Sequence, residues 1–137
     1  MATSTLDSNG TEREVASADP ALCRLAVHSF SEKLLDTEIF FHVTKLMDSF
    51  LLWIGNKPAR MSNLAVALNT RCDKVPSAAM LLGDTANTQP STLAQKLAKS
   101  TGKQVFVSCS LPLMDQMLVS LVEKRIKEEL KANPQCF

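Results

Sequence analysis

Few residues of this chain have the chemistry of a catalytic or metal-binding group. The two histidines, His28 and His42, fall in segments that we expect to be strands, without the HExxH spacing of a zinc-binding helix or a nearby Cys/Asp/Glu cluster. A structural or interface role therefore fits them better than proton transfer. No two cysteines have the CxxC spacing of a zinc site or a redox dithiol. They are Cys23, Cys72, Cys109 and Cys136.

Cys109 and Asp84 are the remaining candidates for a reactive group. Cys109 lies in an apolar run, which favours a buried and inert thiol. Asp84 follows an expected strand, but its neighbours Gly83 and Thr85 favour a turn in which the carboxylate accepts backbone N–H groups. Phosphate-binding glycine motifs and the GxSxG elbow are absent from the sequence. We therefore expect no catalysis, cofactor or metal, and keep an enzyme that uses Cys109 or His42 as a less favoured alternative.

The composition indicates one globular domain that follows a tail. With 137 residues, 45% hydrophobic and 21% charged, the chain can bury a core. The net charge of +1 argues against nucleic acid or an anionic membrane as the main partner, and no apolar stretch approaches the ~20 residues that span a bilayer. The start of the chain has few large aliphatic residues, so we expect residues 1–22 to be a disordered tail and residues 23–137 a single domain.

Charge is unevenly distributed between these two parts. Residues 1–20 contain four acidic residues and one basic residue (−3), which leaves fourteen bases against ten acids (+4) in the remainder. The N-terminus has neither the basic start nor the apolar core of a signal peptide. We therefore expect a cytoplasmic protein that can also be nuclear.

Apolar residues at consecutive positions mark the interior of a sheet. Strand side chains alternate between two faces, so a run such as 50–54 is apolar on both. We expect six strands, at 25–30, 38–47, 50–54, 64–68, 78–82 and 105–109.

Two helices complete the expected domain. The first has the capping-box spacing of Thr92 and Gln95 at its start and Gly102 at its end. The second begins at Pro112, has Asp115 in its first turn and ends at Asn133. Its apolar stripe contains Met114, Leu118, Leu121, Val122, Ile126 and Leu130.

Two helices cannot cover both faces of such a sheet. Six strands at ~4.8 Å spacing span roughly 29 Å, and two helices ~10 Å apart cover one face only. The predicted fold is therefore α+β: about six mainly antiparallel strands with two helices on one face, the other face packing on the sheet of a partner.

The hairpin between the second and third strands predicts which side chains share a face. With Asp48-Ser49 as the turn, Met47 lies opposite Phe50. The face with Phe41, Val43, Phe50, Leu52 and Ile54 is almost purely apolar, as expected beneath helices, with Lys45 reaching outward at its edge. The other face mixes aromatic and hydrogen-bonding side chains, so we expect it to bind the partner, although a one-residue slip would exchange the faces. These partner-binding residues are Phe40, His42, Thr44, Leu46, Leu51, Trp53 and Phe106.

A short basic segment gives a second candidate contact. Lys96, Lys99 and Lys103 have no acidic neighbour in the sequence. They are either a solvated helix face or a docking patch for an acidic protein surface, where charge steers association more than it adds affinity.

Six segments, in order, resemble the proteasome assembly chaperone 4 family, and together they extend from the second strand to the second helix. No segment is a strong motif by itself, so their order and spacing carry the resemblance. The segments are 48–55, 63–67, 81–85, 93–98, 103–108 and 122–129.

The resemblance implies a non-enzymatic assembly factor. Members of this family pair with proteasome assembly chaperone 3, guide formation of the α-ring of the 20S proteasome, and have six-stranded antiparallel sheets that stack face to face. Gln135-Cys136-Phe137 lacks the hydrophobic–tyrosine–any ending of other proteasome binders, so we expect contact with α-ring subunits through the folded body. Homodimerisation in isolation stays open, and a dimerisation scaffold for another cytosolic complex is the alternative.

Overall fold

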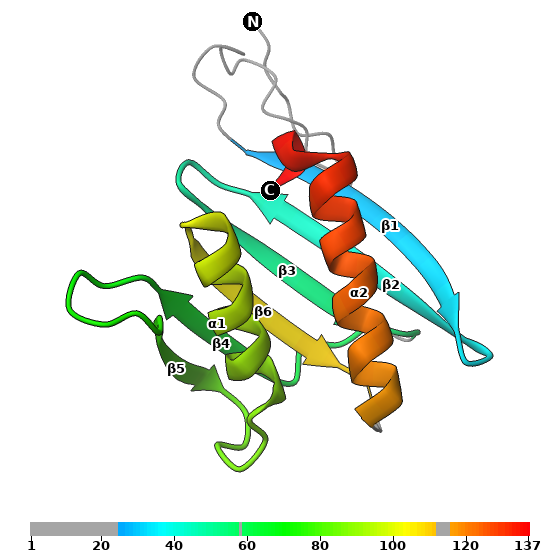
Figure 1. Ribbon diagram of the computed structural model, residues 1–137. Coiled ribbons are helices and arrows are strands. Elements are labelled where there is room, and N and C mark those ends of the chain that lie inside the picture. The colour runs from blue at the N-terminus through cyan, green and yellow to red at the C-terminus, as the bar shows by residue number, and fades with distance from the viewer. Residues whose placement is uncertain (1–24, 58, 112–115) are drawn as a thin grey trace, which may run out of the picture.

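The computed structural model describes residues 25–57, 59–111 and 116–137. This part of the chain contains six strands, two α-helices and one 3-10 turn (Figure 1). The elements in order are β1 (Ala26–Leu34), β2 (Thr37–Lys45), β3 (Ser49–Gly55), β4 (Leu64–Leu68), β5 (Ser77–Leu82), α1 (Gln89–Thr101), β6 (Gln104–Ser110), α2 (Gln116–Ala132) and η1 (Pro134–Cys136). The expected tail at 1–22 lies outside the described residues.

All six strands form one sheet in the order β1-β2-β3-β6-β4-β5. Only β3 and β6 pair in parallel, and the other four neighbouring pairs are antiparallel. The connection through α1 inserts β6 between β3 and β4, so the last strand completes the centre of the sheet. The predicted α+β class with six mainly antiparallel strands and two helices is confirmed.

The hairpin between β2 and β3 has a different register from the one predicted. Phe50 pairs with Lys45, not with Met47, and the backbone N–H of Leu46 donates to the carbonyl oxygen of Ser49. The two-residue turn is therefore Met47-Asp48, one position earlier than predicted, and the residue opposite Phe50 changes by two positions. Because this shift is two residues, an even number, every side chain keeps its predicted face.

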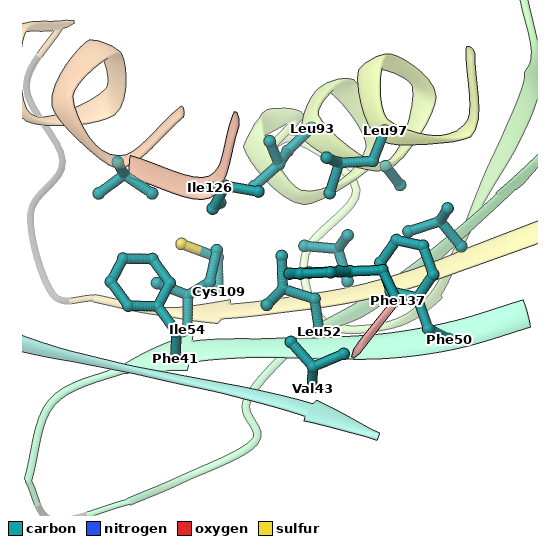
Figure 2. Close-up of a cluster of buried hydrophobic side chains, with 14 of the residues drawn as sticks. Phe41, Val43, Phe50, Leu52, Ile54, Leu93, Leu97, Cys109, Ile126 and Phe137 are labelled. Atoms are coloured by element: carbon teal, nitrogen blue, oxygen red, sulfur yellow. The ribbon is translucent and has the colours of Figure 1, made fainter. Parts of the chain in front are cut away.

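Both helices lie on one face of the sheet and cover the core (Figure 1). The strand residues predicted beneath them are fully buried, with at most 1% exposure. The aliphatic stripe of α2 buries Leu118, Val122 and Ile126 against them, while α1 contributes Leu93 and Leu97 (Figure 2). The core strand residues are Ile39, Phe41, Val43, Phe50, Leu52, Ile54, Val105 and Val107.

The ends of α1 agree only in part with the expected caps. The helix begins at Gln89 after Thr88, so Thr92 is inside it and Gln95 donates to the carbonyl of Pro76 instead of closing a capping box. The prediction of the start was wrong because Pro90 initiates the helix one turn earlier. Gly102 ends the helix with φ +73°, as predicted. The expected start of the second helix, including Pro112, Met114 and Asp115, lies outside the described residues.

An ionic network fixes α2 to the edge strand β1. His28 Nε2 lies 2.6 Å from a carboxylate oxygen of Glu129, which also accepts hydrogen bonds from Arg125 and Asn133. Arg125 in turn donates to Glu32 of β1 at 2.9 Å. Burial alone would raise the pKa of Glu129, but the hydrogen bonds from His28, Arg125 and Asn133 outweigh it and lower the pKa below 4.5.

The lowered pKa predicts an acid-sensitive contribution to stability. A carboxyl group whose pKa falls on folding stabilises the protein above its unfolded-state pKa, and the contribution is lost as pH falls through the folded-state pKa. We expect Glu129→Gln to destabilise the chain near pH 6, and the difference from the parent chain to shrink toward pH 3. Urea unfolding across this range measures it, and a difference independent of pH would contradict the assignment.

Candidate functional site

The candidate site is the sheet face opposite the helices, called here the open face. Strand alternation together with the strand register places apolar side chains of all six strands on it, and none of them is fully buried. Leu81 keeps 55% of its surface exposed and Leu68 keeps 43%, although both are in the sheet. The apolar side chains of the open face are Val27, Phe40, Leu51, Trp53, Leu64, Val66, Leu68, Ala79, Leu81 and Phe106.

A row of apolar side chains crosses the middle of the open face. Leu51 of β3 lies beside Phe106 of β6, and Phe106 lies beside Val66 of β4. All three are partly exposed, while the adjacent residues Phe50, Ala65 and Val105 are buried under the helices. Such a flat apolar row, rimmed by polar residues, is typical of a surface that packs against another protein.

Polar side chains border a shallow hollow at the β1–β3 side of the open face. The hollow has a volume of about 490 Å³, and Phe40, His42 and Trp53 are in its lining. Ser29 Oγ lies 2.8 Å from Nδ1 of His42, and this histidine is exposed. The Lys57 ammonium lies 5.2 Å from the centre of the Phe40 ring. The hollow can thus accept an apolar side chain next to a hydrogen-bonding group.

Trp53 has a second role within its own chain. Its indole N–H donates to the carbonyl oxygen of Arg60 at 2.7 Å, which ties the β3–β4 loop to the open face. The ring also packs over Gly55, where an added Cβ would lie 2.4 Å from the indole. The chain therefore covers part of this end of the open face itself, and Trp53 is a poor choice for testing partner binding alone.

The structure brings most of the predicted partner-binding residues together. Phe40, His42, Thr44, Leu51, Trp53 and Phe106 all lie on the open face. Leu46 follows the last residue of β2, next to the turn, so the strand register assigns it to neither face. The sequence-based prediction also missed Val27, Val66 and Leu81, although continuing the same alternation into β1, β4 and β5 would have found them.

The three lysines predicted as one patch have different environments. Lys96 has no acidic neighbour in the sequence, but in space it pairs with both carboxylate oxygens of Glu123 at 3.0 Å. Lys103 donates to the main-chain oxygen of Phe137. Lys99 is exposed in the last turn of α1. A docking role for the three residues remains a prediction.

The candidate catalytic groups do not converge on one place. His28 points to the helix layer and His42 to the open face, each with its own partner. Asp84 accepts a hydrogen bond from the backbone N–H of Ala86, which confirms the predicted turn. Within residues 25–57, 59–111 and 116–137, no three His, Cys, Asp or Glu side chains are grouped as metal ligands. No described helix is long and apolar enough to cross a bilayer.

Cys109 is buried beneath the helices, and its chemistry can be tested directly. Burial raises the pKa of its thiol to about 11, despite a backbone hydrogen bond at Leu111 that acts in the opposite direction. Near pH 7.5 we expect iodoacetamide to modify exposed Cys72 at least about 100-fold faster than Cys109, because only the thiolate reacts. Peptide mass spectrometry measures both rates. Native labelling of Cys109 at the rate of Cys72 would revive the alternative of a reactive cysteine.

The fold and the open face define this chain as an α+β protein-interaction domain. A family profile described as Proteasome assembly chaperone 4 matches residues 38–111. The Homo sapiens protein named Proteasome assembly chaperone 4 is 47% identical over 113 residues, which cover 82% of this chain and 91% of the relative. Its Mus musculus counterpart is 45% identical over 125 residues, 91% of this chain and 97% of the relative. The chain therefore belongs to the proteasome assembly chaperone 4 family, and this membership supports a role in proteasome assembly.

A solved structure supports the fold independently. A chain from "Crystal Structure of a Novel Chaperone Complex for Yeast 20S Proteasome Assembly" matches with a TM-score of 0.58. The match covers 77% of this chain and 96% of that chain at 16% identity, so it shows a shared fold.

Proposed function

We propose that this chain is an assembly chaperone that forms a heterodimer with proteasome assembly chaperone 3 and promotes formation of the α-ring of the 20S proteasome. The observation that carries the proposal is the apolar row of Leu51, Phe106 and Val66 on a sheet face that the described part of the chain leaves uncovered. Family membership supplies the class of partner, since the matching relatives are named proteasome assembly chaperones.

The proposed mechanism is differential binding. A scaffold accelerates correct assembly when it binds an assembly intermediate more tightly than the finished ring. The two layers of the domain suit this task, because the open face can hold the sister chaperone while the helix layer stays accessible to α subunits. An interface of modest size permits release as assembly proceeds.

Native mass spectrometry tests the proposal. The chain is mixed with proteasome assembly chaperone 3, with α subunits, and with both. We expect a one-to-one complex with the chaperone and a larger complex when α subunits are added. Binding to neither would overturn the proposal and favour a dimerisation scaffold for another complex.

We further propose a cytoplasmic and nuclear location. Fluorescence microscopy of the tagged chain tests this location, and confinement to an organelle would contradict it.

A further inference from the structure

A groove on the helix layer is separate from the open face. It lies between the C-terminal ends of α1 and α2, beside η1, and has a volume of about 490 Å³. Its apolar lining comes from Leu130, Pro134 and Phe137. Its polar lining is hydroxyl-bearing or basic, with no acidic side chain from the described residues. We call it the C-terminal groove. Its residues are Ser100, Thr101, Lys103, Lys127, Leu130, Lys131, Pro134 and Phe137.

Basic side chains line the C-terminal groove, while Glu123 and Glu128 line a neighbouring hollow that Lys127 and Lys131 share. Lys127 and Lys131 are one helical turn apart on α2, both are exposed, and neither forms an ion pair with another described residue. Lys103 is partly engaged by the main-chain oxygen of Phe137. Each helix C-terminus contributes roughly half a negative charge. Two helix ends therefore offset about one of the three lysines, and the groove remains suited to an acidic segment with an apolar anchor.

We propose that the acidic N-terminal segment of this same chain, residues 1–22, docks in the C-terminal groove. The segment contains four acidic residues and one basic residue. Glu14 is next to Val15, one of the few large aliphatic residues there, and Glu12 lies two residues before Glu14, with Arg13 between them. Val15 contacts the apolar lining while the two carboxylates approach Lys127 and Lys131. The inference goes beyond the proposed function and does not depend on the identity of any partner.

The position of β1 makes this docking geometrically simple. The start of β1 lies beside η1 at the same end of the molecule (Figure 1). The His28 and Phe137 ring centres are 6.5 Å apart, and Leu25 is three strand residues, or about 10 Å, before His28. Eleven residues, the number from Leu25 back to Glu14, span roughly 18 Å as a random coil. The segment can therefore reach the groove, and its attachment raises its effective concentration.

Docking of this kind places a competitor on the helix layer. An acidic surface of a partner must displace the segment before it reaches Lys127 and Lys131. The open face lies on the opposite side of the sheet, so the docked segment leaves it free. The proposed docking thus concerns the helix layer alone.

Hydrogen exchange of the full chain, quenched after milliseconds to seconds and read by mass spectrometry, tests the proposal. We expect peptides that cover residues 10–19 to exchange about tenfold more slowly than in the double variant Lys127→Glu/Lys131→Glu, which corresponds to a closing free energy of about 1.4 kcal/mol. Raising the salt from about 0.05 to 0.5 M is expected to reduce this protection, because it shortens the screening length.

Two further variants make the result specific. Lys99→Glu/Lys124→Glu changes the net charge equally at exposed residues outside the groove and is expected to keep the protection. Glu12→Lys/Glu14→Lys is expected to restore protection when combined with the reversed groove lysines. Equal exchange in the parent chain and in Lys127→Glu/Lys131→Glu would overturn the proposal. Protection that increases with protein concentration would also overturn it, since the segment would then bind a second copy.

Discussion

Replacing Leu51 with aspartate is expected to weaken the proposed complex with proteasome assembly chaperone 3 by about 100-fold to 1,000-fold while the isolated domain stays folded. Leu51 is partly exposed at the centre of the open face, beside Phe106. Central apolar residues of an interface contribute about 2–4 kcal/mol, and burying an unpaired carboxylate adds a further cost. Isothermal titration calorimetry gives the affinity, and thermal unfolding of the isolated chain gives its stability.

Leu35→Asp is a matched control for this variant. Leu35 is also exposed, but it lies in the β1–β2 turn with φ +50°, a conformation that aspartate tolerates better than leucine. We expect its affinity for the partner to equal that of the parent chain. Equal affinities for Leu51→Asp and the parent would show that the partner does not bind the open face.

Replacing the adjacent residue, Phe50, with alanine is expected to have the opposite effect. Phe50 is fully buried beneath the helices, and its ring meets the Phe137 ring edge to face, with centres 5.4 Å apart. Loss of a buried aromatic ring costs about 3–5 kcal/mol, because transfer energy is lost and a cavity remains. Urea unfolding of the isolated chain measures this loss.

Phe106→Ala provides the comparison for the buried ring. Phe106 is partly exposed on the open face, so the same truncation is expected to reduce the stability of the isolated chain by less than half as much. A loss below about 1 kcal/mol for Phe50→Ala would contradict the assignment of the covered face. Two consecutive residues of β3 thus separate stability from binding.

Local patterns in the sequence predicted most of the elements and both faces of the hairpin. Consecutive apolar residues identified the central strands. Side chains of a strand alternate between the two faces, so a strand whose faces are both apolar has apolar residues at neighbouring positions. The error of two residues in pairing Phe50 did not exchange the faces, since strand side chains repeat every two residues. The assignment of Leu46 stays a prediction, because this residue lies just beyond the end of β2.

Other features had no local signal. The β1–β2 hairpin turns at Leu35-Asp36, both with positive φ, where glycine or asparagine is the usual indication. The contact of Lys96 with Glu123 joins two helices 27 residues apart in the chain, so the sequence around Lys96 could not reveal it. The network of His28, Glu32, Arg125 and Glu129 likewise spans β1 and α2.

The sequence by itself determined the types of element, the residues of the core and the need for a second surface to cover the sheet, because these depend on the spacing of apolar residues along the chain. Only the tertiary structure decided that β6 inserts between β3 and β4, that Trp53 anchors its own loop, and that Lys127 and Lys131 border a groove near the start of β1. These features depend on contacts between distant segments, whose geometry is fixed when the helices pack on the sheet.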